Sequence, residues 1–331
     1  MKIIGVNGFG RIGRYFTRMS LENQEVDVAV VNDLADINTL AHLLKYDSVH
    51  RKIKQEFLVE GNKIVFENGK EIVFISEKNP ENIQWSDYGV DFVLEATGIF
   101  RTTESASKHL IGGAKKVILS APSKDAITRT VVLGVNDDLL QDSDIIVSNA
   151  SCTTNSAAPV VKVMKEFCEI ESIFISTIHS YTSDQRLHDA PHSDLRRARA
   201  AAESIVPTTT GAAKALAKIF PELEGQIGGC GIRVPVPDGS MTDLTFIVKS
   251  PPSIETITSA MKSAAENELK GILGYTEDPI VSSDVIGDPR SCLFDAKLTS
   301  VVGNMVKVVA WYDNEAGYSN RLIDLIVKMK V

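Results

Sequence analysis

Residues 2–33 read KIIGVNGFGRIGRYFTRMSLENQEVDVAVVND, and this stretch decides the fold of the first half of the chain. Lys2–Asn7 is a short apolar run that predicts a buried strand, and apolar side chains then recur at helical spacing to about Leu21. Val26–Asn32 predicts a second buried strand, which ends at Asp33. The order of strand, glycine turn, helix, strand and acid is typical of a unit that binds a dinucleotide.

Each glycine of the turn has a physical task. Gly8 permits the tight turn, Gly10 lets a pyrophosphate approach the backbone, and Gly13 lets the helix pack closely on the strand. The helix N-terminus offers free N–H groups and a positive dipole end. Asp33 is suited to accept hydrogen bonds from the adenosine ribose, and it would repel a 2′-phosphate, so NAD is favoured over NADP. The alternative, a strand–helix turn without a ligand, leaves the Asp33 spacing unexplained.

The residues up to 150 alternate between strand-like and helix-like segments. This alternation predicts a doubly wound parallel sheet with both faces covered, that is, an α/β Rossmann domain. Asn68-Gly69 joins two further strand patterns as a hairpin within that sheet. The expected strands are Val90–Glu95, Lys116–Ser120, Thr130–Leu133, Asp144–Ser148, Lys63–Phe66 and Glu71–Ile75, and the expected helices are Asp36–Lys45 and Thr103–Leu110.

After about residue 150 the strand patterns become longer and crossovers fewer. We therefore expect a second, α+β domain with a mixed or antiparallel sheet. Its expected strands are Ile173–His179, Gly228–Val234, Asp243–Lys249 and Val306–Tyr312, and its expected helices begin near Cys152 and span Ala212–Ile219 and Ile257–Leu269. The predicted domains are residues 1–150, completed by a C-terminal helix at 315–331, and residues 151–314.

The composition excludes several classes of protein. The chain has 331 residues, 44% of them hydrophobic and 24% charged, which excludes intrinsic disorder and disulfide scaffolds. The net charge of −8 disfavours a dedicated nucleic-acid binder. The four cysteines form no CxxC pair, so we expect no zinc or other metal site. Without a signal-like start or an apolar run of membrane length, the sequence predicts a cytoplasmic enzyme with no membrane contact.

Cys152 stands at the start of a predicted helix, between the cap-type residues Ser151 and Thr153. The helix dipole favours a thiolate there, so the position predicts a lowered pKa for Cys152. His179 ends a strand pattern, where its side chain is able to emerge at a sheet edge and pair with the thiol. The alternative is structural, because single cysteines are commonly buried apolar groups.

Basic and hydroxyl side chains gather in the second half of the chain. Arg196, Arg197 and Arg199 lie close together, and Thr208–Gly211 precedes a helix. Threonine-rich turns before helices expose N–H and hydroxyl donors to phosphate oxygens. Arg233 ends a strand pattern and is either a solvated charge or a bidentate anion ligand. A salt-bridged surface is the competing interpretation of the arginine cluster.

Taken in order along the chain, five motifs resemble one family, the phosphorylating glyceraldehyde-3-phosphate dehydrogenases. The motifs are Gly8–Gly13, Ser151–Asn155, Leu195–Ala201, Thr210–Lys214 and Trp311–Glu315, and they span the whole chain. The resemblance implies an NAD-dependent enzyme that converts glyceraldehyde 3-phosphate and inorganic phosphate to 1,3-bisphosphoglycerate through a hemithioacetal and a thioester. It also implies a homotetramer, in which the loop Thr182–Arg199 reaches a neighbouring cofactor site.

The resemblance assigns roles to individual residues. Cys152 matches the nucleophile and His179 matches its base and later acid. The positions that match cofactor contacts are Gly8, Gly10, Arg11, Ile12, Gly13, Asp33, Lys78, Thr97, Ser120 and Asn314. The positions that match the site of the substrate phosphate are Thr182, Asp184 and Arg233. The positions that match the inorganic-phosphate site are Ser151, Thr153, Arg197, Thr210 and Gly211.

The sequence departs from the family pattern at three places. Ala316 replaces a bulkier residue, Gly228–Gly231 is unusually rich in glycine, and Pro237–Ser240 carries Asp238 in place of the more usual asparagine. These changes bear on cofactor affinity and local rigidity, and they leave the expected chemistry in place.

Other interpretations stay open at the level of sequence. An erythrose-4-phosphate dehydrogenase would share the chemistry, but the intact Thr209–Gly211 segment argues against it. Reductases of aspartyl or glutamyl phosphates lack the Ser151–Asn155 motif. A non-catalytic NAD-bound regulatory protein would need neither Cys152 nor His179, and a cysteine hydrolase would not need the glycine turn.

Overall fold

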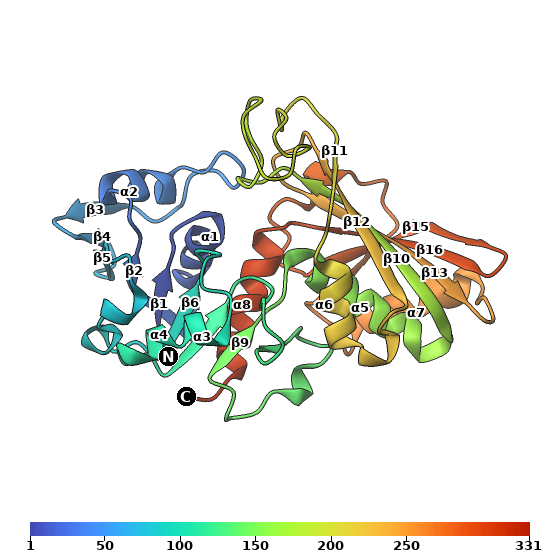
Figure 1. The fold of residues 1–331 in the computed structure, drawn as a ribbon, viewed down its shortest axis with the longest axis horizontal. Helices are drawn as coiled ribbons and strands as arrows, with labels where there is room; N and C mark the ends of the chain where they lie inside the picture. Colours follow the sequence, from blue (N-terminus) through green and yellow to red (C-terminus); the bar gives the residue numbers. More distant parts are fainter. The chain divides into compact units, whose positions relative to one another are not determined.

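The computed structural model describes residues 1–331, which form two compact units. The first unit comprises Met1–Val131, Asp138–Ala150 and Ser319–Val331. The second comprises Val132–Asp137 and Ser151–Tyr318. Figure 1 colours the chain from the N-terminus to the C-terminus and labels the elements of each unit.

The first unit is built on a nine-stranded sheet in the order β3-β4-β5-β2-β1-β6-β7-β9-β8. Its strands are β1 (Lys2–Asn7), β2 (Val26–Asn32), β3 (Phe57–Glu60), β4 (Lys63–Phe66), β5 (Glu71–Ile75), β6 (Phe92–Glu95), β7 (Lys116–Leu119), β8 (Arg129–Thr130) and β9 (Ile146–Ser148). Its helices are α1 (Arg11–Ser20), α2 (Ile37–Lys45), α3 (Thr103–Ala106) and α4 (Lys108–Ile111). The run from β5 to β9 is parallel throughout, whereas β3 and β4 add an antiparallel edge. The predicted doubly wound Rossmann sheet is confirmed.

Burial explains why these short segments are strands. Every residue of β6 and β7 is buried, as expected for central parallel strands covered on both faces. Val30, Val93, Val117 and Trp85 pack into one apolar cluster between the sheet and its covering segments. The last helix, α8 (Ala316–Lys328), is held at its carboxyl end, where Lys2 Nζ donates to backbone carbonyls of its last turn.

The second unit contains a seven-stranded mixed sheet in the order β11-β12-β10-β13-β16-β15-β14. Its strands are β10 (Ile170–Ser180), β11 (Val206–Thr208), β12 (Ile227–Val234), β13 (Ser240–Val248), β14 (Leu273–Thr276), β15 (Cys292–Val302) and β16 (Met305–Tyr312). Its helices are α5 (Cys152–Phe167), α6 (Ala212–Ile219) and α7 (Ile254–Glu266). Four of its six strand pairs are antiparallel, so the expected α+β arrangement is confirmed.

One face of this second sheet is covered by helices. Helix α5 contacts β13, β15 and β16, α6 contacts β12, and α7 contacts β14 and β15 (Figure 1). Side chains that alternate toward this face, such as Ile173, Ile175 and Thr177 on β10, are buried. His179 follows the same alternation, so the helix-covered face carries it toward the N-terminus of α5.

Several segments differ from their predicted form, and three of these differences bear on the sheets and helices described above. The single helix expected at Thr103–Leu110 is split into α3 and α4, because Ser107 Oγ hydrogen-bonds the carbonyl of Glu104 and competes with the helical ladder. The strand expected at Thr130–Leu133 is confined to Arg129–Thr130, because Val132 N–H is taken by the side chain of Asn136 in a turn. Strand β15 was not predicted at all, and its pairing with β16 is interrupted between Asp295 and Ser300.

No helix of the chain is both long and apolar enough to cross a membrane.

Candidate active site

A cavity of about 610 Å³ lies at the carboxyl ends of β1, β2 and β6 in the first unit. This is the edge of a doubly wound sheet where ligands bind, because the chain leaves neighbouring strands toward opposite faces there. Of the predicted cofactor contacts, Gly8, Gly10, Asp33, Lys78 and Thr97 line the cavity. Its other lining residues are Asn7, Asn32, Leu34, Glu77, Asn79, Ala96, Ile99 and Phe100.

The glycine turn leaves the start of α1 open. Gly8 has a φ of +95°, which favours glycine, and a Cβ on Gly13 would lie 2.1 Å from the carbonyl oxygen of Gly8. A Cβ on Gly10 would meet nothing within 4 Å, and Gly10 caps the helix without a side-chain hydrogen bond. Free N–H groups and open space at a helix start are suited to a pyrophosphate.

Asp33 is held by the backbone around it. Its Oδ2 accepts from the N–H of Phe9 at 2.7 Å, and its Oδ1 accepts from the N–H of Ala35 at 2.9 Å. Each carboxylate oxygen retains acceptor capacity for a further donor such as a ribose hydroxyl.

The remaining predicted cofactor contacts lie outside the wall of this cavity. Arg11 forms an ion pair with Asp47, and Ile12 and Gly13 belong to α1. Ser120 follows β7, and its N–H donates to the carbonyl of Glu95.

Asn314 belongs to the second unit. Its Oδ1 accepts from the hydroxyls of Ser240 at 2.8 Å and Ser180 at 3.0 Å. Since both hydroxyls occupy the oxygen, the amide nitrogen of Asn314 is left as the donor that the side chain presents.

The second unit brings Cys152 and His179 together. Sγ of Cys152, the first residue of α5, lies 3.5 Å from Nε2 of His179, which is near the end of β10. Ser151 Oγ caps α5 by accepting from the N–H of Thr154 at 3.1 Å. Ala150, just before the cap, has a φ of +56°, a left-handed conformation that turns the chain sharply into the helix.

The protonation of this pair is set by burial and by Arg233. Burial raises the pKa of the Cys152 thiol, while Arg233 and the N–H of Thr153 act to lower it. Burial, together with the positive charge of Arg233, lowers the pKa of His179 to about 3. The sequence predicted a lowered pKa for Cys152, and that prediction is wrong, because desolvation by burial outweighs the charge of Arg233 and the hydrogen bonds from Thr153. The pair is therefore a thiol beside a neutral imidazole.

Arg233 and the Ser180 carbonyl meet at the other nitrogen of the His179 ring. Nδ1 lies 2.8 Å from the carbonyl oxygen of Ser180 and 2.6 Å from an Nη1 of Arg233, which also donates to that carbonyl at 3.1 Å. A guanidinium only donates, so its contact with Nδ1 requires that nitrogen to be unprotonated, whereas the carbonyl favours a proton there. The position of Arg233 thus selects the tautomer of His179.

The predicted phosphate ligands are distributed around this pair. Arg197 forms an ion pair with Asp184 and donates to the hydroxyl of Thr208 at 2.9 Å. The sequence assigned Arg197 and Asp184 to different phosphate sites, and the structure places these two residues in direct contact. Thr210 Oγ accepts from the N–H of Ala212 at the start of α6, and Gly211 caps that helix.

Two further predicted ligands make hydrogen bonds within the chain. The hydroxyl of Thr153 is buried and lies 2.9 Å from the hydroxyl of Tyr312. The N–H of Thr182 reaches the side chain of Gln185 at 3.4 Å.

The comparisons with known proteins agree over the whole chain. Residues 2–103 match the family description "Glyceraldehyde 3-phosphate dehydrogenase, NAD binding domain", and residues 151–314 match the C-terminal domain of the same family. The chain belongs to the glyceraldehyde-3-phosphate dehydrogenase family. A glyceraldehyde-3-phosphate dehydrogenase of Geobacillus stearothermophilus is 54% identical over 324 residues, which cover 97% of this chain and 96% of the relative. One of Mycobacterium avium is 52% identical over 329 residues, covering 98% and 97%.

Membership of the glyceraldehyde-3-phosphate dehydrogenase family makes NAD the cofactor of this chain. The residues present fit that cofactor: the α1 N-terminus is open above Gly10, and the carboxylate of Asp33 lines the same cavity.

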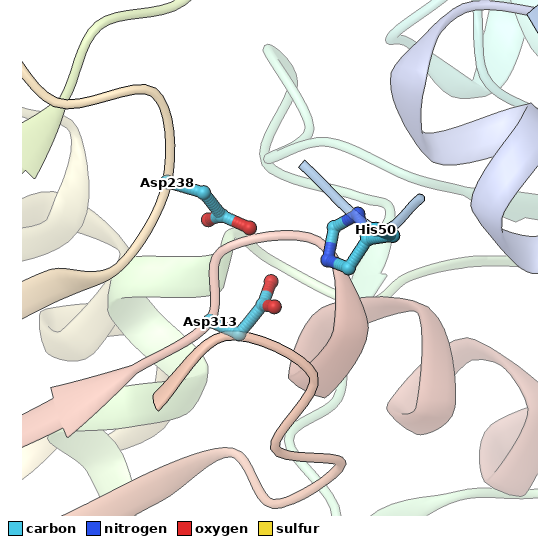
Figure 2. Close-up of side chains that lie close together, drawn as sticks. All are labelled: His50, Asp238 and Asp313. Carbon is cyan, nitrogen blue, oxygen red and sulfur yellow. The ribbon is translucent and has the colours of Figure 1, made fainter. Parts of the chain in front are cut away.

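Sequence reasoning missed two polar side chains of this dehydrogenase-family site. Tyr312 places its hydroxyl between Thr153 and Thr177, and its ring meets His179 edge-on with centroids 6.0 Å apart. Asp238 lies beside Asp313, the residue that precedes Asn314 (Figure 2). The position of Tyr312 two residues before Asn314 was the one available signal, because residues at one strand end share a site.

Proposed function

We propose that this chain oxidises the aldehyde of D-glyceraldehyde 3-phosphate and phosphorylates the product, using NAD and inorganic phosphate and yielding 1,3-bisphosphoglycerate. The observation that carries the proposal is the 3.5 Å distance between Cys152 Sγ and His179 Nε2 at the N-terminus of α5. A thiol within reach of a neutral imidazole is the arrangement that covalent catalysis on an aldehyde needs.

The cofactor is placed in the cavity of the first unit. Gly8, Gly10 and Gly13 would receive the pyrophosphate, and Asp33 the adenosine ribose, which favours NAD over NADP. Further proposed contacts are Arg11, Ile12, Lys78, Thr97, Ser120 and Asn314, the last presenting its amide nitrogen to the nicotinamide carboxamide. We accordingly assign NAD binding to residues 1–150 with the C-terminal helix at 315–331, and catalysis to residues 151–314.

The first chemical step joins Cys152 to the substrate. His179 takes the thiol proton at Nε2 as the sulfur attacks the aldehyde carbon, and the product is a hemithioacetal. The oxyanion that forms is within the reach of the Cys152 N–H at the start of α5 and of the protonated His179.

The second step oxidises the hemithioacetal. His179 first gives its proton to the oxyanion and so returns to its neutral form, and it then removes the proton of the resulting hydroxyl. NAD held in the cavity of the first unit would supply the hydride acceptor for this oxidation. A thioester on Cys152 remains, so the energy of oxidation is conserved in the C–S bond. Inorganic phosphate then attacks the thioester carbon, the sulfur leaves, and it regains a proton from His179.

Two phosphate sites complete the proposal. Arg233, Thr182 and Asp184 are assigned to the substrate phosphate, and Ser151, Thr153, Arg197, Thr210 and Gly211 to inorganic phosphate. Support comes from Arg233: an anion that draws its guanidinium away from His179 Nδ1 leaves that nitrogen free to donate to Ser180. Nε2 is then the unprotonated base that faces the thiol.

We further propose that the protein is a cytoplasmic homotetramer. The support for assembly is an apolar row across five strands, on the face of the second sheet opposite the helices. The row comprises Ile232, Ile178, Met241, Trp311 and Leu293, which are neighbours in register. Phe174, which lies on the same face of β10 four residues before Ile178, is 51% exposed. An apolar sheet face of this extent is typical of a subunit interface.

The decisive experiment follows NAD reduction by absorbance with glyceraldehyde 3-phosphate, with and without inorganic phosphate. Sustained, phosphate-dependent reduction that disappears in Cys152→Ser supports the proposal. Reduction with erythrose 4-phosphate in place of glyceraldehyde 3-phosphate would instead support the related dehydrogenase. Absence of reduction by protein that binds NAD would favour a regulatory role.

The same assay tests the base. We expect His179→Asn to lower kcat by about 10²–10⁴-fold, the usual contribution of positioned proton transfer, with NAD affinity unchanged. Unaltered turnover in this variant would refute the assignment of His179.

A further inference from the structure

A buried series of hydrogen-bonded side chains crosses the first sheet behind the cofactor cavity, and the mechanism above does not use it. Trp85 Nε1 donates to His109 Nδ1 at 3.2 Å, and His109 Nε2 lies 3.1 Å from Glu95 Oε2. Asn7 Nδ2 donates to the same oxygen at 2.6 Å, and Asn32 Nδ2 donates to Asn7 Oδ1 at 2.7 Å. These side chains, here called the Glu95 network, are at most 5% exposed.

The direction of each hydrogen bond is fixed from the Trp85 end. An indole N–H only donates, so Nδ1 of His109 accepts and is unprotonated. A proton on both ring nitrogens would set two donors against each other at 3.2 Å, so His109 is neutral. Its one ring proton is therefore on Nε2 and is donated to Glu95.

The direction of the hydrogen bonds is also fixed from the opposite end of the network, at Asn32. The backbone N–H of Glu77 donates to Asn32 Oδ1 at 2.7 Å, and Asn32 Nδ2 donates to the carbonyl of Glu77 at 2.8 Å. This orients the Asn32 amide nitrogen toward Asn7 Oδ1, and it leaves the amide nitrogen of Asn7 facing Glu95.

Both ends therefore require Oε2 of Glu95 to accept and never to donate. Its Oε1 accepts from the N–H of Thr97 at 2.9 Å and from the Thr97 hydroxyl, whose oxygen in turn accepts from the N–H of Ile99. Its Oε2 accepts from Asn7 and His109. A carboxyl group that only accepts is ionised, so four neutral donors stabilise a charge buried to 2% exposure.

The network connects this charge to the cavity wall. Asn7, Asn32, Glu77 and Thr97 line the cavity, and Glu95 lies behind them. Asn7 and Glu95 end the paired strands β1 and β6, which meet where the ligand edge of the sheet begins.

We propose that Glu95 is a positioning residue for the cofactor, which holds the ends of β1 and β6 in the geometry that the dinucleotide needs by means of Asn7 and Thr97. The inference rests on the proposed placement of NAD in this cavity. Glu95 acts through its neighbours and touches no reacting atom.

Glu95→Gln tests the proposal with almost no change in shape. An amide has one accepting oxygen, and its NH₂ group would face either Asn7 and His109 or the backbone N–H of Thr97. Two hydrogen-bond donors would then face each other, and this unfavourable contact forces one residue of the cavity wall away. We expect the Kd for NAD, measured by calorimetry, to rise about tenfold or more. The kcat at saturating NAD and the KM for the aldehyde should stay within about twofold, since neither reports on this wall.

Trp85→Phe is the matched control. It removes the donor at the far end of the network from a fully buried position and leaves untouched Asn7 and Thr97, the two wall residues through which Glu95 is proposed to act. We expect it to lower the Tm while the Kd for NAD stays within about twofold of the wild type. An equal rise in Kd for Trp85→Phe would overturn the proposal, because general destabilisation would then explain both variants.

Asp33→Ala tests the proposed placement of NAD independently of the role of Glu95. A raised Kd for Asp33→Ala with an unchanged Kd for Glu95→Gln refutes the role of Glu95 alone. Unchanged Kd values for both variants refute the proposed cofactor site itself. If Glu95→Gln does not fold, peptide-resolved hydrogen exchange on the wild type without NAD decides. Slow exchange at Thr97 and Glu77 supports a preformed wall, and fast exchange there refutes it.

Discussion

Asp238 keeps its proton at a pH where an ordinary aspartate has lost it. Burial raises the pKa of Asp238 to about 8, and the negative charges of Asp313 and Glu315 act in the same direction. Its Oδ1 accepts from the N–H groups of Gly239 at 2.8 Å and Asn314 at 3.3 Å, so the loop and the strand end are joined through this carboxyl group. The family's more usual asparagine would offer the same hydrogen bonds without a titration.

We expect Asp238→Asn to stabilise the protein increasingly as the pH rises. The pKa of Asp238 is higher in the folded chain than in the unfolded chain, so folding takes up a proton between the two values. The stability from this group is complete below about pH 4 and is lost as the pH rises toward about 8. Residue 238 does not titrate in the variant. The free energy of unfolding of the variant should therefore rise relative to that of the wild type by at most about 1.4 kcal/mol per pH unit in that window.

Free energies of unfolding by urea at several pH values between about 5 and 9 check this prediction. Above about pH 8 the difference between the two proteins should stop growing. Parallel pH profiles for the wild type and Asp238→Asn would mean that Asp238 is ionised in the folded chain.

At the scale of the element, α5 presents Cys152 because its first turn is capped. Ser151 Oγ accepts from the N–H of Thr154 at 3.1 Å, and α7 begins in the same way, with Ser253 Oγ accepting from the N–H of Thr256 at 3.1 Å. The two caps have one geometry, but only the first stands beside a candidate nucleophile.

We expect Ser151→Ala and Ser253→Ala to destabilise the protein by about 1 kcal/mol each, the usual cost of a lost N-cap. Only Ser151→Ala should slow the alkylation of Cys152 by iodoacetamide, because fraying of the first turn removes the Thr153 N–H that helps to lower the pKa of the thiol. Denaturation and alkylation rates measured on both variants check this. Equal alkylation rates would show that the cap supports the helix without influencing Cys152.

Local patterns predicted the elements whose burial is regular along the chain. Lys2–Asn7, Val26–Asn32 and Ala212–Ile219 have the bounds that were expected, since each is a compact apolar run or a helical stripe between clear breaks. Strand β15 was missed because Asp295 and Lys297 interrupt its pattern, and its pairing with β16 and β14 makes it a strand. Such pairing is a property of the folded sheet, and no window of sequence contains it.

The residues of the candidate site were likewise predictable only where a local sequence signal marks them. The glycine turn and Cys152 stand in local signals, a turn and a helix start, that constrain chemistry directly. Glu95 and Asp238 carry no local signal, and Tyr312 has only its position before Asn314. Their roles come from partners that are far away in sequence, such as His109 and Thr153. The pKa of Cys152 was predicted with the wrong sign because the degree of burial is also a tertiary property.

At the scale of the whole molecule, the two faces of the second sheet have different surroundings. The inner face is covered by α5, α6 and α7, whereas the outer face carries the apolar row from Ile232 to Leu293. Phe174 lies on the same face four residues before Ile178, and Gly228 makes room for it, since a Cβ on Gly228 would lie 3.1 Å from the Phe174 ring. In the proposed homotetramer, a second copy of the chain covers this outer face.

We expect Phe174→Glu to dissociate the assembly into smaller species with the fold of the subunit intact. The side chain is 51% exposed in the single chain, so a charge there is tolerated in a separated subunit and is costly only when an interface removes it from water. Leu58→Glu, on the edge strand β3 of the first unit and 69% exposed, is the matched control and should leave the assembly unchanged. Light scattering gives the mass of each species, and circular dichroism confirms the fold. A wild-type monomer would refute the proposed homotetramer. A Phe174→Glu variant that keeps the wild-type mass would place the subunit contacts away from this face.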